Sequence, residues 1–276
     1  MDKRARLESY INEQGINASR QNVLPTFYDP KAQAGESVPV FPYATIANER
    51  VNLDVLDAEA MSLASMLAVL NLNTQPKDRV LDTCAAPGMK GMYLHALTSE
   101  IDYCANDISH TRLGRLKRLF NTHGIFPEAI THHDASRLTD LYQESSFDRI
   151  IIDAPCSGEG VIMGGDDKLL DVWSPAKVKR LQQIQIKILK NAWRLLKPGG
   201  RLVYATCTLN KNENERVIKK ALKVDVIVDT APLDTHTAQI VQPLHALRIL
   251  PSAHSIGFFI AVLEKHEQES QHYTNE

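Results

Sequence analysis

Two of the four cysteines lie just beyond short apolar segments that are typical of buried β-strands. Cys156 comes three residues after the segment Asp148–Asp153, and Cys207 directly follows the segment Arg201–Thr206. A thiolate is the strongest common nucleophile among side chains, and nearby donors lower a thiol pKa, so thiols in this setting suit covalent catalysis. We therefore expect Cys156, Cys207 and the carboxylate of Asp153 to meet in one site.

The other two cysteines, Cys84 and Cys104, do not extend this pattern into a metal site. Successive cysteines are 20, 52 and 51 residues apart, so there is no CxxC pair and we expect no bound metal. A disulfide framework is not expected in a long chain without a secretion signal. Cys104 lies inside the apolar run Ile101–Ala105 and is predicted to be a buried thiol, because free cysteine behaves as a small hydrophobe.

A loop of small residues follows another strand-like segment, Arg79–Asp82. Small residues let a ligand approach the backbone closely, and the helix that follows offers its N-terminus to an anionic group. The loop matches neither GxGxxG nor GxxxxGKS/T, which counts against a dinucleotide or a nucleoside triphosphate. The candidate ligand-binding residues of this loop are Cys84, Ala85, Ala86, Pro87, Gly88, Met89 and Lys90.

Two further carboxylates follow the next strand-like segments. Asp107 comes nineteen residues after Gly88, a spacing that suits a carboxylate gripping ribose hydroxyls. A cap of the following helix is an equally good interpretation of Asp107. Asp134 follows the third segment and could receive an adenine amino group, or it could simply begin a turn. Both interpretations stay open for each residue.

Short apolar segments alternate with amphipathic ones from residue 79 onward, which predicts an α/β fold. Near-continuous apolar strands indicate a mostly parallel sheet with helices on both faces, and ligands bind such sheets beyond the strand C-termini. The strand candidates are Arg79–Asp82, Ile101–Asp107, Ala129–His132, Asp148–Asp153 and Arg201–Thr206. The helix candidates are Lys90–Leu97, Ser109–His123, Ala176–Leu196 and Glu213–Leu222, with Lys197–Gly200 ending the third of these sharply.

Composition places the chain among globular proteins. Its 276 residues are 43% hydrophobic and 23% charged, which excludes a mostly disordered or collagen-like chain. The net charge of -2 excludes a protein that is basic as a whole. No apolar stretch approaches the roughly 20 residues of a membrane span, and the N-terminus lacks the apolar core of a signal peptide. We expect a soluble, cytoplasmic protein.

The chain is predicted to divide near residue 75. Residues 1–75 form a small N-terminal region with a polar helix, a proline-punctuated stretch from Leu24 to Pro42 and a helical run over Asp57–Leu70. Residues 76–264 form the catalytic domain. Residues 265–276 form a polar tail that is expected to fray.

Several motifs together resemble the RsmB/Nop/Sun family of S-adenosylmethionine-dependent RNA cytosine-5 methyltransferases. The motifs are CAAPGMK, NDIS followed by Arg112, DAPCSGEG, KPGGRLVYATCTLN and ENE. The pair DAPC and TCTL, in that order, is the most specific feature. The resemblance covers residues 55–223 and resumes over 245–263, and it implies a class I methyltransferase core with a Rossmann-like sheet.

The resemblance also implies a role for each motif residue. Cys207 is implied to attack carbon 6 of the cytosine and Asp153 to hydrogen-bond the ring. Lys90 is implied to orient the base and Asp153, or to lower a thiol pKa. Cys156 is implied to assist release after methyl transfer. S-adenosylmethionine is implied to bind over Cys84–Lys90, Asp107, Arg112, Asp134 and Asp153.

The chain departs from the family pattern at two points. Relatives usually have APGGKT, whereas this chain has Met89 for the second glycine and Gly91 for the threonine. The chain also ends soon after GFFIAVLEK, which leaves no room for the C-terminal RNA-binding module of many relatives. The expected partner is RNA, either tRNA or rRNA, bound by a monomer, with room for a helper protein.

Local charge favours RNA contact on the core. No Asp or Glu occurs after Val172 up to Lys211, whereas nine Lys and Arg residues do, among them Lys177, Lys179 and Arg180. Phosphate contacts dominate nucleic-acid affinity, so a basic face can serve a chain of near-zero net charge. A solvated helix face remains the alternative interpretation for each residue.

Three rival functions fit the motifs less well. A DNA cytosine-5 methyltransferase would take its nucleophile from Pro155-Cys156 and would not need the cysteine of TCTL. An exocyclic-amine methyltransferase would need a loop of the Asn/Asp-Pro-Pro-Tyr type after the fourth strand, which is absent. A non-catalytic RNA-binding protein would need neither cysteine nor Asp153.

Overall fold

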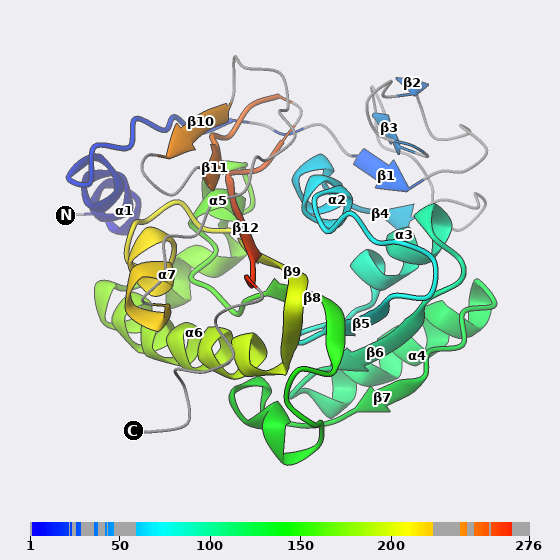
Figure 1. Cartoon of the computed structure of the whole chain (residues 1–276). Coiled ribbons are helices and arrows are strands. Elements are labelled where there is room, and N and C mark those ends of the chain that lie inside the picture. Colours follow the sequence, from blue (N-terminus) through cyan, green and yellow to red (C-terminus); the bar gives the residue numbers. More distant parts are fainter. Residues whose placement is uncertain are drawn as a thin grey trace.

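The computed structural model describes residues 2–21, 23, 26–28, 36–37, 42, 44–46, 59–222, 238–241, 246–253 and 255–266. Their centre is an eight-stranded sheet with the order β10-β11-β12-β9-β8-β5-β6-β7 (Figure 1). The strands are β5 (Arg79–Asp82), β6 (Asp102–Asn106), β7 (Ala129–Thr131), β8 (Phe147–Asp153), β9 (Leu196–Thr206), β10 (Ala238–Val241), β11 (Ala246–Ile249) and β12 (Phe258–Glu264). Strands β5 to β9 pair in parallel, and β10 to β12 are antiparallel additions beside β9.

Helices cover both faces of this sheet. The helices are α1 (Lys3–Asn12), α2 (Leu63–Leu70), α3 (Met89–Leu97), α4 (His110–Thr122), α5 (Glu159–Met163), α6 (Pro175–Leu195) and α7 (Glu215–Ala221), with 3-10 turns η2 (Ala135–Asp140) and η3 (Asp167–Val172). A separate small sheet has the order β2-β3-β1-β4, from β1 (Thr26–Tyr28), β2 (Glu36–Ser37), β3 (Ala44–Ile46) and β4 (Glu59–Ala60). None of the described helices is both long and apolar enough to cross a membrane.

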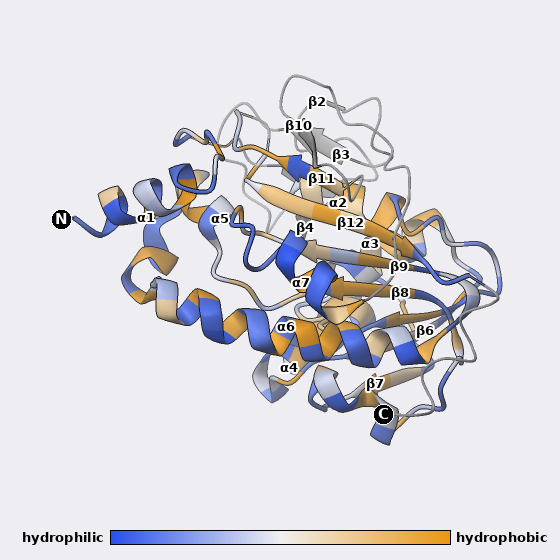
Figure 2. Cartoon of the chain, turned by 60° about the vertical axis from the view of Figure 1, so that its left-hand side comes forward, coloured by the Kyte–Doolittle hydropathy of each residue, from blue (hydrophilic) through white to orange (hydrophobic). Residues whose placement is uncertain are grey.

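Alternation along the central strands builds two hydrophobic cores. Val80 and Ile151 point to the face covered by α2, α3 and α4, whereas their neighbours Leu81 and Ile152 point to the face covered by α6 and α7. Successive strand residues face opposite sides of a sheet, so strands buried on both sides must be apolar throughout. Figure 2 shows this directly: the central strands are largely hydrophobic, and α6 carries alternating hydrophilic and hydrophobic bands.

The predicted α/β sheet is confirmed, and all five predicted strands are present. The order of strands reverses between β5 and β8, because β6 and β7 lie on one side of β5 and β8 and β9 on the other. In such sheets the ligand site lies beyond the strand C-termini at this reversal.

Two predicted boundaries are wrong. The helical run Asp57–Leu70 starts only at Leu63: Glu59–Ala60 is strand β4, and the Ser62 hydroxyl caps α2 by accepting the Ser65 N–H at 3.2 Å. An apolar pattern cannot show that a serine inside it is a helix cap.

The second wrong boundary is the start of the last parallel strand, which begins at Leu196 rather than Arg201. The Gly199 N–H donates to the Lys265 carbonyl at 2.6 Å and the Lys265 N–H donates to the Gly200 carbonyl at 3.1 Å, so the segment expected only to end the helix is paired as strand. Lys265, the first residue of the predicted polar tail, is buried, and its Nζ donates to the Trp193 and Leu196 carbonyls at the end of α6. Residues 267–276, and most of the proline-punctuated stretch, lie outside the described residues.

Candidate active site

The C-termini of β5, β8 and β9 bring the predicted chemical groups to one edge of the sheet. Asp82 ends β5, Asp153 ends β8 opposite Ala205 of β9, and Cys207 follows the last residue of β9. The Ala154 N–H donates to the Ala205 carbonyl at 3.0 Å, which keeps the two loops side by side beyond the sheet. The parallel register therefore sets which loops meet.

The two predicted thiols face one another. The Cys156 and Cys207 Sγ atoms are 3.1 Å apart, both residues are partly exposed, and all four cysteines are free. The pKa of Cys156 is raised well above its usual value, first by its hydrogen bond to the Cys207 sulfur and then by burial. The hydrogen bond between the two sulfur atoms and burial therefore both favour the neutral form of Cys156.

Lys90 and Asp153 form an ion pair beside the thiols. The Lys90 Nζ lies 2.6 Å from an Asp153 carboxylate oxygen and 3.4 Å from the Ser65 hydroxyl. Burial lowers the Lys90 pKa, but the charges of Asp153, Asp82 and Cys207 outweigh it and leave the pKa raised. Lys90 therefore stays an ammonium group that stabilises negative charge at this end of the sheet.

Asp82 is a buried carboxylate that sequence reasoning did not single out. It is 1% exposed and accepts a hydrogen bond from the Tyr103 hydroxyl at 3.0 Å. Burial raises the pKa of Asp82 to about 7, with Asp153 adding to this effect and Lys90 and Tyr103 opposing it. An apolar strand ending in aspartate could have signalled it, but the same pattern is common at turns.

The departure at Gly91 has a structural reason. A Cβ atom at Gly91 would overlap the Tyr103 hydroxyl and would come within 2.8 Å of the Phe120 ring. The space that a threonine would fill is thus taken by the Tyr103 hydroxyl that reaches Asp82. The position of the Tyr103 side chain therefore requires a glycine at residue 91.

The small-residue loop is tied to the carboxylate at the end of the next strand. An Asp107 carboxylate oxygen accepts the Ala86 N–H at 3.2 Å and the other accepts the Ser109 N–H at 2.8 Å. Arg112 lies 3.3 Å from Asp107 and also donates to the Ala86 carbonyl. Gly88, which caps α3, has a φ of +116°, a conformation that favours glycine.

The other predicted ligand residues lie around this loop. Ala85 and Ala86 are buried, Pro87 is exposed and Met89 is partly exposed at the start of α3. Asp134 is exposed and accepts the Ser136 N–H at 2.8 Å as the cap of η2, so its side chain begins the turn that the sequence analysis named as the alternative to adenine binding. Ile108, which the sequence analysis passed over, is 67% exposed beside Asp107 and offers an apolar surface there.

Cys84 and Cys104 do not belong to the facing pair of thiols. Burial raises the pKa of Cys104 to about 12, and it also raises the pKa of Cys84. Cys104 is fully buried, as predicted. Among the described residues no group of three or more His, Cys, Asp or Glu side chains is arranged to hold a metal ion.

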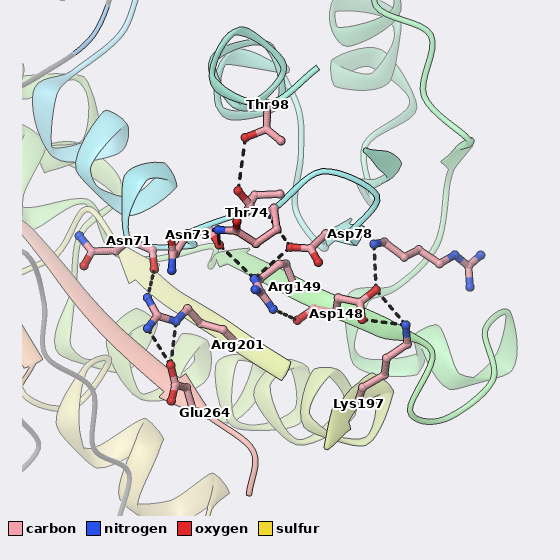
Figure 3. A network of polar contacts seen from close by, with 12 residues as sticks. Asn71, Asn73, Thr74, Asp78, Thr98, Asp148, Arg149, Lys197, Arg201 and Glu264 are labelled. Carbon is pink, nitrogen blue, oxygen red and sulfur yellow. Dashed lines mark hydrogen bonds and ion pairs between the residues drawn. The ribbon is translucent and has the colours of Figure 1, made fainter. Parts of the chain in front are cut away.

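The basic stretch Val172–Lys211, which contains no Asp or Glu, forms ion pairs with acidic residues from other parts of the chain. Lys197 forms an ion pair with Asp148 at 2.8 Å, Arg201 pairs with Glu264 at 2.7 Å, and Figure 3 shows both in one polar network with Arg149 and Asp78. Arg194 pairs with Glu144. The prediction of an uncompensated basic face is therefore wrong for this end of the stretch.

The first turns of α6 carry basic side chains that lack such ion-pair partners among the described residues. Lys179 and Arg180 are exposed and Lys177 is partly exposed, and within the described part of the chain none of the three forms an ion pair. The middle of α6 contacts the site, because Gln185 donates to the Pro155 carbonyl at 2.8 Å.

Comparison with known proteins places the chain in a family. Residues 69–264 match the family model described as 16S rRNA methyltransferase RsmB/F. The chain belongs to this family. The resemblance predicted from the motifs is thereby confirmed.

Curated relatives of this RsmB/F-family chain are longer proteins. It is 36% identical over 213 residues to "Ribosomal RNA small subunit methyltransferase F" of Klebsiella pneumoniae (strain 342), a match covering 75% of this chain and 44% of that protein. It is 35% identical over 212 residues to "Ribosomal RNA small subunit methyltransferase B" of Shewanella oneidensis, covering 76% and 47%. The matched part is thus less than half of either relative.

Solved structures share the fold. The crystal structure of PH0851 has a TM-score of 0.79 and 27% identity, covering 89% of this chain and 60% of that chain. The structure of NSun6 from Pyrococcus horikoshii with SFG has a TM-score of 0.69 and 26% identity, covering 81% and 58%. The predicted class I methyltransferase architecture agrees with both.

Proposed function

We propose that this RsmB/F-family chain transfers a methyl group from S-adenosylmethionine to carbon 5 of a cytosine in RNA. The names of its curated relatives favour small-subunit ribosomal RNA over tRNA as the substrate. The observation that carries the proposal is the facing pair Cys156 and Cys207, 3.1 Å apart, beside the ion pair of Lys90 and Asp153.

The target atom explains the need for a thiol. Carbon 5 of cytosine is a weak nucleophile, and a thiolate that adds to carbon 6 turns carbon 5 into an enamine-like centre. In the proposal, Cys207 is this nucleophile, because Lys90 stabilises negative charge at its sulfur and the Cys156 sulfur lies within hydrogen-bond distance, 3.1 Å away. Asp153 hydrogen-bonds the ring and Lys90 holds Asp153 in place.

Cys156 then serves release. The hydrogen bond to the Cys207 sulfur is the largest cause of the raised Cys156 pKa. Once that sulfur is bonded to carbon 6 its charge is gone and the Cys156 pKa falls, so Cys156 can lose its own proton to water. The resulting thiolate can then take the proton from carbon 5, directly or through water. Loss of that proton restores the ring double bond and expels Cys207.

The residues around the small-residue loop fit S-adenosylmethionine. The buried Asp107 carboxylate holds the loop at Ala86 and suits ribose hydroxyls, and exposed Ile108 offers a surface to the adenine ring. Gly88 and the start of α3 suit the carboxylate end of the molecule, since a helix N-terminus favours anions. When bound, S-adenosylmethionine supplies a methyl group activated by a sulfonium centre.

One assay tests the proposed function. The protein is incubated with labelled S-adenosylmethionine and separate fractions of small-subunit ribosomal RNA and tRNA, and the RNA is digested and its nucleosides are analysed by mass spectrometry. Label in 5-methylcytidine from ribosomal RNA is the expected result. Label in another nucleoside would reject carbon 5 as the target, and label in tRNA alone would change the substrate.

The target cytosine must be unpaired or flipped out of the helix, because carbon 6 is inaccessible within a stacked duplex.

Asp107→Ala should weaken cofactor binding. Charge-assisted hydrogen bonds contribute about 1.5–3 kcal/mol, so the Kd for S-adenosylhomocysteine measured by calorimetry should rise roughly 10- to 150-fold. Asp102→Ala is the matched control, because exposed Asp102 begins the same strand at its far end. Undiminished binding in Asp107→Ala would remove this residue from the cofactor site.

RNA affinity should fall steeply with salt and depend on the start of α6. Each phosphate contacted contributes roughly 0.7 to 0.9 to the logarithmic salt slope. Combined charge reversal at Lys177, Lys179 and Arg180 should flatten that slope, whereas reversal at Arg194, which is already paired with Glu144, should not. An unchanged slope in the triple variant would assign these three residues to a solvated face.

A further inference from the structure

Two buried carboxylates next to the cysteine pair are not used by the proposed chemistry. Glu159 and Glu213 are both 0% exposed, and within the described residues neither forms an ion pair. They come from the GEG and ENE motifs, each of which follows one of the cysteines. Buried carboxylates are costly unless hydrogen bonds satisfy them, so their contacts indicate what they hold.

Glu159 belongs to the Cys156 loop and binds the Cys207 loop. One of its carboxylate oxygens accepts the backbone N–H groups of Leu209 at 3.2 Å and Asn210 at 2.9 Å. The other accepts the Asn210 side-chain amide at 3.0 Å.

Glu213 makes the reciprocal contact. It belongs to the segment after Cys207, and its carboxylate accepts the backbone N–H of Ser157, the neighbour of Cys156, at 3.0 Å. It also accepts the Gln185 amide at 2.9 Å and the Asn210 amide at 2.8 Å. Each cysteine loop therefore supplies a carboxylate that binds backbone N–H of the other loop.

The rest of the ENE motif braces the same loop. Asn214 accepts the Thr206 hydroxyl at 2.6 Å and donates to the Thr208 carbonyl at 3.1 Å, so it holds the residues on either side of Cys207. The Ser157 and Thr208 hydroxyls are 2.8 Å apart and add a further link between the loops. The position of one sulfur relative to the other is thus fixed by a buried polar network.

The charges around the two thiols are unequal. Lys90 interacts electrostatically with Cys207, whereas negative groups surround Cys156 and raise its pKa after the effects of the Cys207 hydrogen bond and burial. The titratable groups that interact with the Cys156 thiol are Cys207, Glu213, Asp153 and Tyr204.

We propose that Glu213 is a positioning residue of the cysteine pair: its carboxylate fastens the Cys156 loop to the Cys207 loop and lies where it disfavours negative charge on the Cys156 sulfur. The surroundings of the two thiols are then unequal before RNA binds, because the negative groups around Cys156 disfavour a thiolate there. The chemical meaning of this inequality rests on the proposed function, in which Cys207 is the nucleophile.

Thiol alkylation of the full chain tests the proposal without RNA or cofactor. The protein is treated with iodoacetamide over a range of pH, and modification of each cysteine is read by peptide mass spectrometry. In the native chain Cys207 should react at a lower pH than Cys156. Glu213→Gln should move the Cys156 midpoint to lower pH and raise the reactivity of Cys156 below that midpoint, because a nearby like charge has been removed. Cys104 is the internal reference and should not change.

Two companion variants separate charge from hydrogen bonding. Glu213→Asp keeps the charge but shortens the side chain, so the Cys156 midpoint should stay near the native one. Glu159→Gln removes a buried charge from the same network, but Glu159 holds the Cys207 loop and should leave Cys156 nearly unchanged. A purely structural role predicts instead that Glu213→Gln and Glu213→Asp alter reactivity equally at every pH.

Each outcome decides the proposal. An unchanged Cys156 midpoint in a folded Glu213→Gln protein overturns it, with folding checked by thermal melting. If that variant does not fold, equal midpoints for Cys156 and Cys207 in the native chain overturn it, and unequal midpoints kept in Glu213→Asp support it. Unequal thiols in a chain that forms no 5-methylcytidine would reject the proposed function alone.

Discussion

Cys207→Ser should abolish methyl transfer and form no covalent complex with RNA, whereas Cys156→Ala should accumulate one. A serine hydroxyl without an activating base is a far poorer nucleophile than a thiolate, so loss of Cys207 should lower turnover by roughly 10⁴-fold or more. Loss of Cys156 removes the group that assists proton removal from carbon 5. The base is then methylated once and stays bonded to Cys207.

A denaturing gel with labelled RNA distinguishes the alternatives. The proposal expects a slowly migrating band in Cys156→Ala and none in the double variant that also carries Cys207→Ser. A DNA-type mechanism would give the opposite pattern, with the band in Cys207→Ala. If both cysteines only packed against one another, both single variants would keep near-native turnover. Cys104→Ser is the control for loss of a thiol remote from the site, since Cys104 contacts Glu128 instead.

The sheet was predictable because strands buried on both faces are apolar throughout. Segments such as Asp148–Asp153 and Arg201–Thr206 differ from the amphipathic helices by period alone, and their order determines which loops share an edge. The helix start at Leu63 was not predictable in this way, since Ser62 caps a helix inside an apolar run. The pairing of Gly199 with Lys265 joins positions far apart in the chain, and no local pattern reports it.

Some residues of the candidate site were predictable from the sequence and others were not. Cys156, Cys207 and Asp153 were found because strand ends converge, and this convergence follows from topology. The contacts of Glu213 and Tyr103 were missed, because a buried polar side chain is specified by partners on other elements rather than by its neighbours in sequence.

The basic stretch shows the limit of counting charge along the chain. Arg201 is far from any acidic residue in sequence, yet Glu264 lies beside it because β12 runs antiparallel to β9. Strand pairing therefore neutralises one end of the stretch. The start of α6 follows the site loops and leaves Lys177 and Lys179 without such partners among the described residues. The unpaired part of the basic stretch is consequently smaller than the sequence indicates.

Gly160→Ala is expected to lower both stability and turnover, because a steric clash at residue 160 should displace the Cys156 loop from the Cys207 loop. A Cβ atom at Gly160 would overlap the Gly257 carbonyl oxygen and lie 2.8 Å from the Gly257 Cα atom. Backbone must therefore move, and the Gly160 N–H that donates to the Cys207 carbonyl at 3.0 Å moves with it. Overpacking of this kind costs about 3 kcal/mol, which lowers Tm by roughly 6–12 °C in a chain of this size.

Turnover of Gly160→Ala should fall even at temperatures where the variant is folded. A displacement of about 1 Å between reacting groups can cost roughly 10²-fold in rate. Turnover measured well below the variant's Tm isolates this effect from unfolding. Gly114→Ala is the matched control: its Cβ atom would meet nothing closer than the Arg118 side chain at 3.8 Å, inside the regular helix α4. That control should gain about 0.5–1 kcal/mol of stability and keep native turnover, since alanine is the better helix former. Native Tm and native turnover in Gly160→Ala would show that the loop after Cys156 does not depend on its contact with Gly257.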